Sequence, residues 1–219
     1  MANNVLKVNG KAIASIAKIN GQTDSDLAKL NGEEFTGTPA DAHVLIDTAP
    51  SDGSDSSLGF TSGIDATYDV YEFHFINIHP ETDDSRFEFQ VSTGSGFNET
   101  ITSTFVRAWH NEAGSSYHLG YTVNEDQAQG NAYQTLYDRV DSAADASTSG
   151  ILTLYAPSST TYVKHFVSRL NGLHADSYTM ECYGAGYINT TNAITQIDFK
   201  FENDEIQDGE IKMYGLAKS

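Results

Sequence analysis

The sequence predicts an all-β protein: an antiparallel β-sandwich of jelly-roll type that carries a repeat-containing arm at its N-terminus. Three observations lead to this fold class. About nine or ten segments after residue 58 alternate apolar and polar residues, which is the period of a half-buried strand. Short polar turns join these segments, and the alternation of strands and helices that marks a parallel sheet is missing. A short repeat precedes them.

The N-terminal repeat consists of three similar phrases, VLKVNG at 5–10, IAKING at 16–21 and LAKLNG at 27–32, each starting eleven residues after the last. Asn-Gly is the strongest short-range turn signal, so each phrase predicts a strand followed by a turn. A continuous helix is the alternative for an eleven-residue period. Glycine costs about 1 kcal/mol inside a helix, which favours the strand-and-turn reading.

Three short apolar units cannot build a core alone, so they need the body, a symmetry mate or another protein to cover them. We therefore interpret residues 1–35 as a docking arm. Its assembly positions are the apolar residues Val5, Val8, Ile13, Ile16, Ile19, Leu27 and Leu30. If each unit of one chain is covered by the next chain, closed symmetry follows, and a homotrimer is the form we favour.

Residues 36–57 are rich in Pro, Gly, Ser and Asp and predict a linker, with room for one short strand at the apolar island 44–46. The β-sandwich body is expected at 58–219. Only one segment, 128–137, is compatible with a helix.

The body strands are expected where one face of a segment is apolar. In VYEFHFINI the apolar positions change phase after Phe75, which predicts either a β-bulge or a strand buried on both faces. The inward positions of the other strands are expected to be Phe87, Phe89 and Val91; Tyr117, Leu119 and Tyr121; Leu152, Leu154 and Ala156; Tyr178, Met180 and Cys182; and Ile197, Phe199 and Phe201.

The charge argues against nucleic acid as a partner. The 219 residues carry a formal net charge of −18, while residues 1–35 are neutral, with four Lys against four acidic residues. An acidic body repels phosphate backbones. We attribute its negative charge to a role in keeping the protein soluble and suppressing non-specific association. The polar N-terminus is followed by no long apolar run, so neither a signal peptide nor a membrane span is expected. Cys182 is the only cysteine, which fits a protein folded in a reducing compartment.

Seven histidines invite a search for metal sites. His74 and His79, followed by Asp83 and Asp84, are the best candidates for ligands. A spacing of five residues places the two histidines on opposite faces of a strand, however, so a strand end stopped by Pro80 is the preferred explanation.

His110 and Glu112 have the spacing of two side chains on one face of a strand, as a general base and its carboxylate require. No Gly-x-Ser-x-Gly turn supplies a nucleophile, and Cys182 has no identifiable base, so a structural role is preferred. Trp109 is expected in the core rather than as a platform for a sugar ring.

Other motifs are equally incomplete. Acidic pairs are too common among 30 acidic residues to indicate a glycosidase. The stretches 52–57 and 202–205 lack the full set of oxygen donors of a calcium loop and are interpreted as turns. The glycines of 184–186 follow a strand but precede no helix, so they do not predict a phosphate site. We therefore expect no catalytic residue, no cofactor and no metal site.

Four segments of the body resemble a family of marine tailed-phage virion proteins that includes those of cyanophages. They are TYDVYEFHFINIHP at 67–80, SSTTYVKHF at 158–166, GAGYINTTNAI at 184–194 and GEIKMYGL at 209–216. The phrases IASIAKING and LAKLNG are similar to repeats at the start of some phage structural proteins. The resemblance implies a non-enzymatic virion structural protein, made in the host cytoplasm, whose partners are other virion proteins in a tail fibre, a spike or a capsid decoration.

Two other functions stay open at this point. Twelve Tyr together with many Ser, Asn and Gly suit loops that recognise a host-surface glycan or protein, so a binding module at a fibre tip is the alternative. An enzyme such as a depolymerase is the third hypothesis, and no motif supports it.

Overall fold

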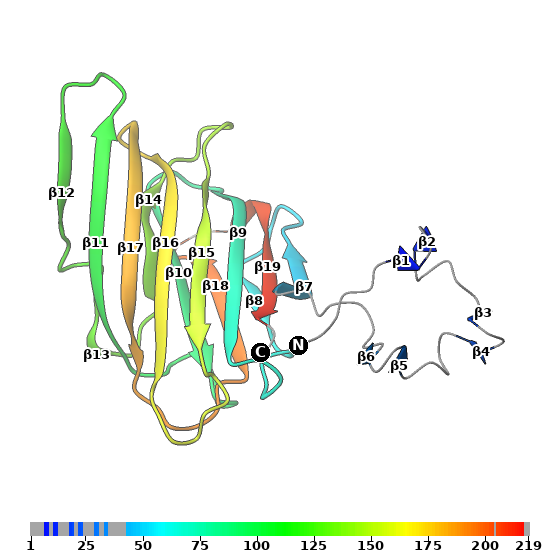
Figure 1. Ribbon diagram of the computed structural model, residues 1–219. Coiled ribbons are helices and arrows are strands. Elements are labelled where there is room, and N and C mark those ends of the chain that lie inside the picture. Colours follow the sequence, from blue (N-terminus) through cyan, green and yellow to red (C-terminus); the bar gives the residue numbers. More distant parts are fainter. Residues whose placement is uncertain are drawn as a thin grey trace. The chain divides into compact units, whose positions relative to one another are not determined.

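The computed structural model describes residues 43–203 and 205–216, together with six two-residue strands between residues 7 and 34 (Figure 1). The chain divides into two units, Met1–Ala42 and His43–Ser219. Each unit is described by itself.

The N-terminal unit contains three short antiparallel hairpins. They are formed by β1 (Lys7–Val8) and β2 (Lys11–Ala12), β3 (Lys18–Ile19) and β4 (Gln22–Thr23), and β5 (Lys29–Leu30) and β6 (Glu33–Glu34). The innermost pairs are Val8 with Lys11, Ile19 with Gln22, and Leu30 with Glu33. The two residues between each pair are Asn-Gly in the sequence. This identical pairing confirms the strands predicted for these residues, and the helical alternative is wrong for them.

The second unit, which we call the body, is built from thirteen antiparallel strands. They are β7 (His43–Pro50), β8 (Leu58–Phe60), β9 (Val70–Pro80), β10 (Ser85–Ser92), β11 (Ile101–Asn111), β12 (Tyr117–Tyr121), β13 (Ala128–Gly130), β14 (Gln134–Val140), β15 (Thr148–Tyr155), β16 (Lys164–His174), β17 (Tyr178–Ile188), β18 (Gln196–Phe201) and β19 (Ile206–Leu216). No helix occurs in the described part of the chain. The all-β prediction is confirmed.

The strands form two layers (Figure 1). The large sheet has the order β7-β19-β9-β15-β16-β17-β11-β12, with β13 also paired to β11, and the small sheet behind it has the order β14-β10-β18-β8. Among the described residues, one pair, Val140 with His174, connects β14 to β16 and so links the two sheets. Successive strands such as β8, β9 and β10 alternate between the layers, as the strands of a jelly roll do.

The core between the layers is aromatic. Phe199 of β18 lies at its centre, with its ring centroid 5.4 Å from that of Phe73 and 5.1 Å from that of Phe75. The rings of Phe87 and Phe89 are 6.2 Å and 6.5 Å from it. All five side chains are buried, which confirms the inward positions expected for β10 and β18.

A β-bulge interrupts β9 where the apolar positions change phase. Phe75 and Ile78 are buried, whereas Ile76 and Asn77 between them are exposed. Asn77 has a positive φ of 52°, and the register between β9 and β19 shifts beside Gly209. The bulge predicted from the sequence is confirmed, and burial on both faces is wrong because Ile76 faces outward.

Two boundary predictions are wrong. Residues 43–50, placed in the expected linker, form β7, which pairs with β19 along its length. The short strand allowed at 44–46 lies within β7, so the strand exists but is longer than expected, and it is the boundary of the body at residue 58 that is wrong. The expected helix at 128–137 is replaced by β13 and the first part of β14. Residues 134–138 are all buried although Gln134, Thr135 and Asp138 are polar, so polarity does not mark an outward face in this strand.

Candidate functional site

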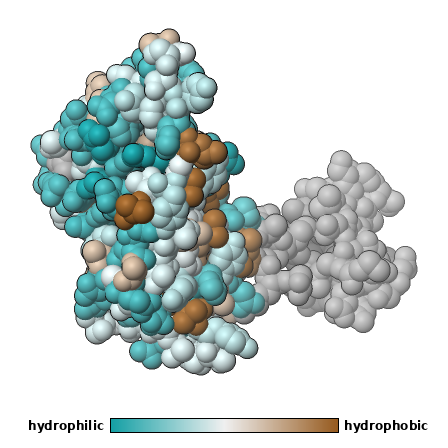
Figure 2. Space-filling model, turned by 90° about the vertical axis from the view of Figure 1, so that its left-hand side faces the viewer, coloured by the Kyte–Doolittle hydropathy of each residue, from teal (hydrophilic) through white to brown (hydrophobic). Residues whose placement is uncertain are grey.

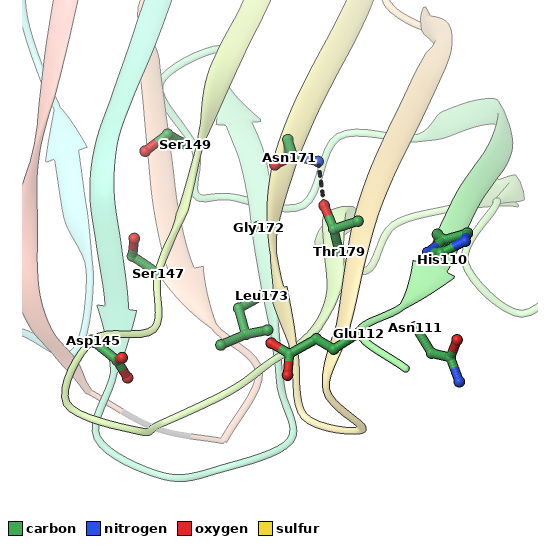
Figure 3. Close-up of a pocket in the computed structure, with 10 residues that line it drawn as sticks. All are labelled: His110, Asn111, Glu112, Asp145, Ser147, Ser149, Asn171, Gly172, Leu173 and Thr179. Carbon is green, nitrogen blue, oxygen red and sulfur yellow. Dashed lines mark hydrogen bonds between the residues drawn. The ribbon is translucent and has the colours of Figure 1, made fainter. Parts of the chain in front are cut away.

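A polar hollow of 490 Å³ lies on the outer face of the large sheet, at one end of β11, β15, β16 and β17 (Figure 3). Its lining consists of His110, Asn111, Glu112, Asp145, Ser147, Ser149, Asn171, Gly172, Leu173 and Thr179. All of these residues except Gly172 and Leu173 have a side chain that can donate or accept a hydrogen bond. The hollow is therefore the strongest candidate for a site in the body.

Two strand residues form the floor of the hollow. The amide Nδ2 of Asn171 donates to Thr179 Oγ1 at 3.3 Å and to the carbonyl of Met180 at 3.0 Å (Figure 3). These bonds hold the amide plane and leave Oδ1 of Asn171 as an acceptor. Ser149 accepts a hydrogen bond from the backbone N–H of Asn77 through Oγ at 2.9 Å, so its hydroxyl proton is available to a ligand.

Two loops wall the hollow. In the first, Oδ1 of Asn111 accepts from the N–H groups of Ser115 and Ser116, which fixes the turn after β11. In the second, Asp141 Oδ1 accepts from the N–H of Ala143 at 2.6 Å and starts the turn that leads to β15. Side-chain bonds to the backbone thus shape both walls.

The charged groups of the hollow are carboxylates. Glu112 and Asp145 stand on its two walls, and the lining includes neither Lys nor Arg (Figure 3). Within the ranges that the structure describes, no side-chain hydrogen bond or ion pair is formed by Glu112, Asp145 or Ser147. These groups are solvated and free to bind a ligand. Their charge favours a neutral or cationic ligand over an anion.

The structure brings His110 and Glu112 to the same hollow, as their spacing predicted. The imidazole of His110 lies parallel to the ring of Tyr117, at 8° with 6.4 Å between centroids. Trp109 points to the opposite side, packs against the core, and stacks on Tyr178 at 4.5 Å. Trp109 is thus partly buried at the margin of the core rather than within it, and its indole is stacked on a tyrosine.

The remaining residues of the hollow could not be predicted. Asp145 and Ser147 precede β15, and Asn171 lies near the end of β16, so they meet His110 only through the order of strands in the large sheet. No local motif marks such a meeting. Strand order is a long-range property that alternation does not encode.

His74 and His79 make separate contacts. His74 Nε2 lies 3.0 Å from Glu72 Oε2, and His79 Nδ1 lies 2.8 Å from the carbonyl of Ala146. The expectation that the two histidines occupy opposite faces is wrong, because the bulge adds a residue and returns His79 to the outer side. The described residues include no group of three or more His, Cys, Asp or Glu side chains suited to a metal ion.

The other motifs have structural roles. In the stretch 52–57, Asp55 Oδ2 accepts from the N–H of Asp52 at 2.7 Å, which is a turn contact. In the stretch 202–205, Glu202 pairs with Arg86 at 2.8 Å, and residue 204 lies outside the described residues. The glycines of 184–186 lie within β17 rather than after it. Burial raises the pKa of Cys182 to about 12, so its thiol is no nucleophile.

A buried ionic network, missed by the sequence analysis, lies where the two sheets meet. Arg86 Nε is 2.8 Å from Glu125 Oε2, and Arg107 donates to Asp138. Glu125 and Asp138 are only 5% and 2% exposed. Burial raises the pKa of both carboxyl groups, and the two arginines oppose that rise. Burial also raises the pKa of Glu88, beside this network, to about 7, and the nearby Glu202 adds to the shift.

The assembly residues predicted in the arm are partly described. Val8, Ile19 and Leu30 lie in β1, β3 and β5. Val5, Ile13, Ile16 and Leu27 lie outside the described residues.

Comparisons with protein-family models, with curated proteins and with solved structures find no match to this chain. Across the described ranges, no helix has the length and apolar character needed to cross a membrane.

Proposed function

We propose that the chain is a non-enzymatic structural subunit of a tailed-phage virion, in a fibre, a spike or a capsid decoration, which assembles through its N-terminal arm. One observation carries the proposal: three hairpins with the same register and the same spacing belong to a unit separate from the body. A two-stranded hairpin is at best marginally stable alone in water. An arm of such hairpins therefore needs a surface to cover it, either a symmetry mate or another virion protein.

Exposed apolar residues on the body support a role in assembly. Brown atoms gather along the right-hand side of the coloured part of Figure 2, which is the outer face of the large sheet. Ile151, Val167 and Tyr183 lie on this face, and Leu119 stands on the edge strand β12 with 71% exposure. Apolar groups gathered on one face are typical of surfaces that meet other proteins.

The first test is the mass in solution of the full chain and of residues 43–219. The body has its own aromatic core, so the shorter chain is expected to fold. We expect a trimeric full chain and a monomeric body, which would assign assembly to the arm. A trimer of both would move the interface to the sheets. A monomeric full chain whose residues 1–42 resist protease on their own would contradict the arm model.

The second test concerns the virion itself. Mass spectrometry of purified phage particles should detect the chain at a fixed ratio to the major particle proteins. An antibody raised against residues 43–219 should label one place on the particle, at the head or along the tail. Absence of the chain from washed particles would overturn the proposal of a virion subunit while leaving the solution assembly untouched.

Recognition of a host surface is the second candidate function. The polar hollow favours it, because unpaired hydrogen-bonding groups line an open face of the sandwich. A fibre subunit both builds the particle and binds the cell, so the two functions are compatible.

A further inference from the structure

We propose that the polar hollow between residues 110–112 and 145–149 is a binding site for an uncharged sugar, one hexose unit or two, at the end of a glycan chain. The inference rests on the second candidate function and names its ligand class. It depends on four properties of the hollow: unpaired groups, size, charge and an aromatic pair at one side.

The unpaired groups match the hydroxyl groups of a sugar. Asn171 Oδ1 and the carboxylates of Glu112 and Asp145 are acceptors, and the hydroxyls of Ser147 and Ser149 are donors (Figure 3). A sugar hydroxyl both donates and accepts, so it can bridge an acceptor and a donor of this set. The fixed amide of Asn171 reduces the entropy lost on binding.

The size of the hollow fits a small ligand. Its volume of 490 Å³ lies within the range of about 300–1,000 Å³ typical of small-molecule sites. It is open to solvent on the outer face of the sheet, so the rest of a glycan chain can extend away from the protein.

The charge of the hollow selects among sugars. Two carboxylates without a neighbouring Lys or Arg in the lining repel acidic sugars such as uronic or sialic acids. A metal ion is the competing ligand for carboxylates. The described residues lack a cluster of three metal-binding side chains, so hydroxyl groups fit the set better.

A pair of stacked aromatic rings lies at the β11 side of the hollow. His110 in the lining and Tyr117 beside it are parallel within 8°, and Tyr117 is 79% exposed. An exposed aromatic face offers apolar contact to the C–H face of a sugar ring while the hydroxyls reach polar groups.

The test uses the full chain and four uncharged disaccharide probes: maltose, cellobiose, lactose and chitobiose. Titration calorimetry should give saturable binding of at least one probe, and ¹⁵N-labelled protein should show shifts centred on residues 110–112 and 171–179. Galacturonic acid and sialic acid should not bind. Binding of the acidic sugars alone would overturn the charge argument, and no binding of any probe would overturn the site.

Variants separate this hollow from other surfaces. Asn171→Ala should weaken binding of the responsive disaccharide by about tenfold, the value of one lost hydrogen bond of about 1.4 kcal/mol. Asn98→Ala, an exposed asparagine in another loop, is the matched control and should bind as the unaltered chain does. Equal affinity of the Asn171 variant, with an unchanged circular dichroism spectrum, would place the sugar elsewhere.

A charge variant tests selectivity. Glu112→Gln removes one of the two carboxylate charges of the lining, so it should reduce the rejection of galacturonic acid, whereas Asp47→Asn, on the distant strand β7, should leave that rejection unchanged. Because these measurements do not depend on the arm, failure of the sugar site leaves the mass measurements on the virion subunit unaffected, and the reverse also holds.

Discussion

Arg107 of β11 donates a hydrogen bond from Nη1 to Oδ2 of Asp138 on β14, and this contact ties the large sheet to the small one. Asp138 is 2% exposed, and its other oxygen lies 3.6 Å from Arg86 Nε. Two arginines therefore share the neutralisation of one buried carboxylate.

Removing one arginine should leave that carboxylate underpaired. We expect Arg107→Met to lower the free energy of unfolding by about 2–4 kcal/mol, because a buried charge that loses a partner keeps its desolvation cost. Urea denaturation at neutral pH measures the change. Arg169→Met is the control, since its pair with Glu181 lies at the surface and is worth at most about 1 kcal/mol. Equal losses in the two variants would contradict the role of burial.

Glu88 should make stability depend on pH. Its folded pKa of about 7 is above its ordinary value of 4.5, so the folded state holds the proton more tightly than the unfolded state does. The associated stability is present below pH 4.5 and is lost as the pH rises towards 7. We expect Glu88→Gln to raise the free energy of unfolding by about 1–3 kcal/mol at pH 8 and to change it little at pH 4.

Denaturation of both proteins at the two pH values measures this difference. A constant gap between Glu88→Gln and the unaltered chain across this range would show that the carboxyl group does not titrate near neutrality.

Alanine substitutions at Gly209 and Gly94 should distinguish the cost of backbone strain from the cost of a steric clash. Both have a φ of 110°, a region that side chains rarely adopt. A Cβ added at Gly209 would lie 2.6 Å from the carbonyl oxygen of Asn77, whereas one at Gly94 would meet nothing within 4 Å. We expect Gly209→Ala to cost at least about 1 kcal/mol more than Gly94→Ala. Thermal denaturation compares them, and equal costs would mean that the bulge yields freely.

Cys182 should react only when the chain unfolds. The side chain is fully buried, so an alkylating reagent cannot reach it. Burial also raises the pKa of the thiol to about 12, so the reactive thiolate does not form near neutral pH. Iodoacetamide at pH 8 should leave the folded protein unlabelled by mass spectrometry, while the same reagent in urea should add one group. Full labelling without denaturant would contradict this burial.

The sequence is informative where a strand has one covered face. Phe87, Phe89 and Val91 were predicted to point inward from their alternation alone, and all three are buried. The same reasoning is wrong for Tyr117, Leu119 and Tyr121, which alternate equally well but remain exposed on β12. It is also wrong for Ala156, which is exposed just beyond the end of β15. Alternation states that two faces differ, and only the packing of the layers decides whether either face is covered.

Segments with little alternation gave the wrong elements. Residues 134–138 are buried as part of β14 although Gln134, Thr135 and Asp138 are polar, so the segment shows no alternation of apolar and polar residues. In the candidate site, the spacing of His110 and Glu112 was visible locally. The contribution of Asn171 was not, because β16 reaches β11 only through β17. The lining residues outside 110–112 therefore come together with His110 only through the order of the strands.

The pairing of the first body strand with the last has a consequence for synthesis. β7 pairs with β19 alone, and β8 pairs with β18 alone, so residues 43–60 find their partners more than 130 positions later. A ribosome must release residues 196–216 before either early strand can add to its sheet. Until then the nascent chain exposes Leu58 and Phe60, which are buried in the finished body. Contacts of such long range form slowly, so chaperones that shield apolar strands have the longest access to this end of the sandwich.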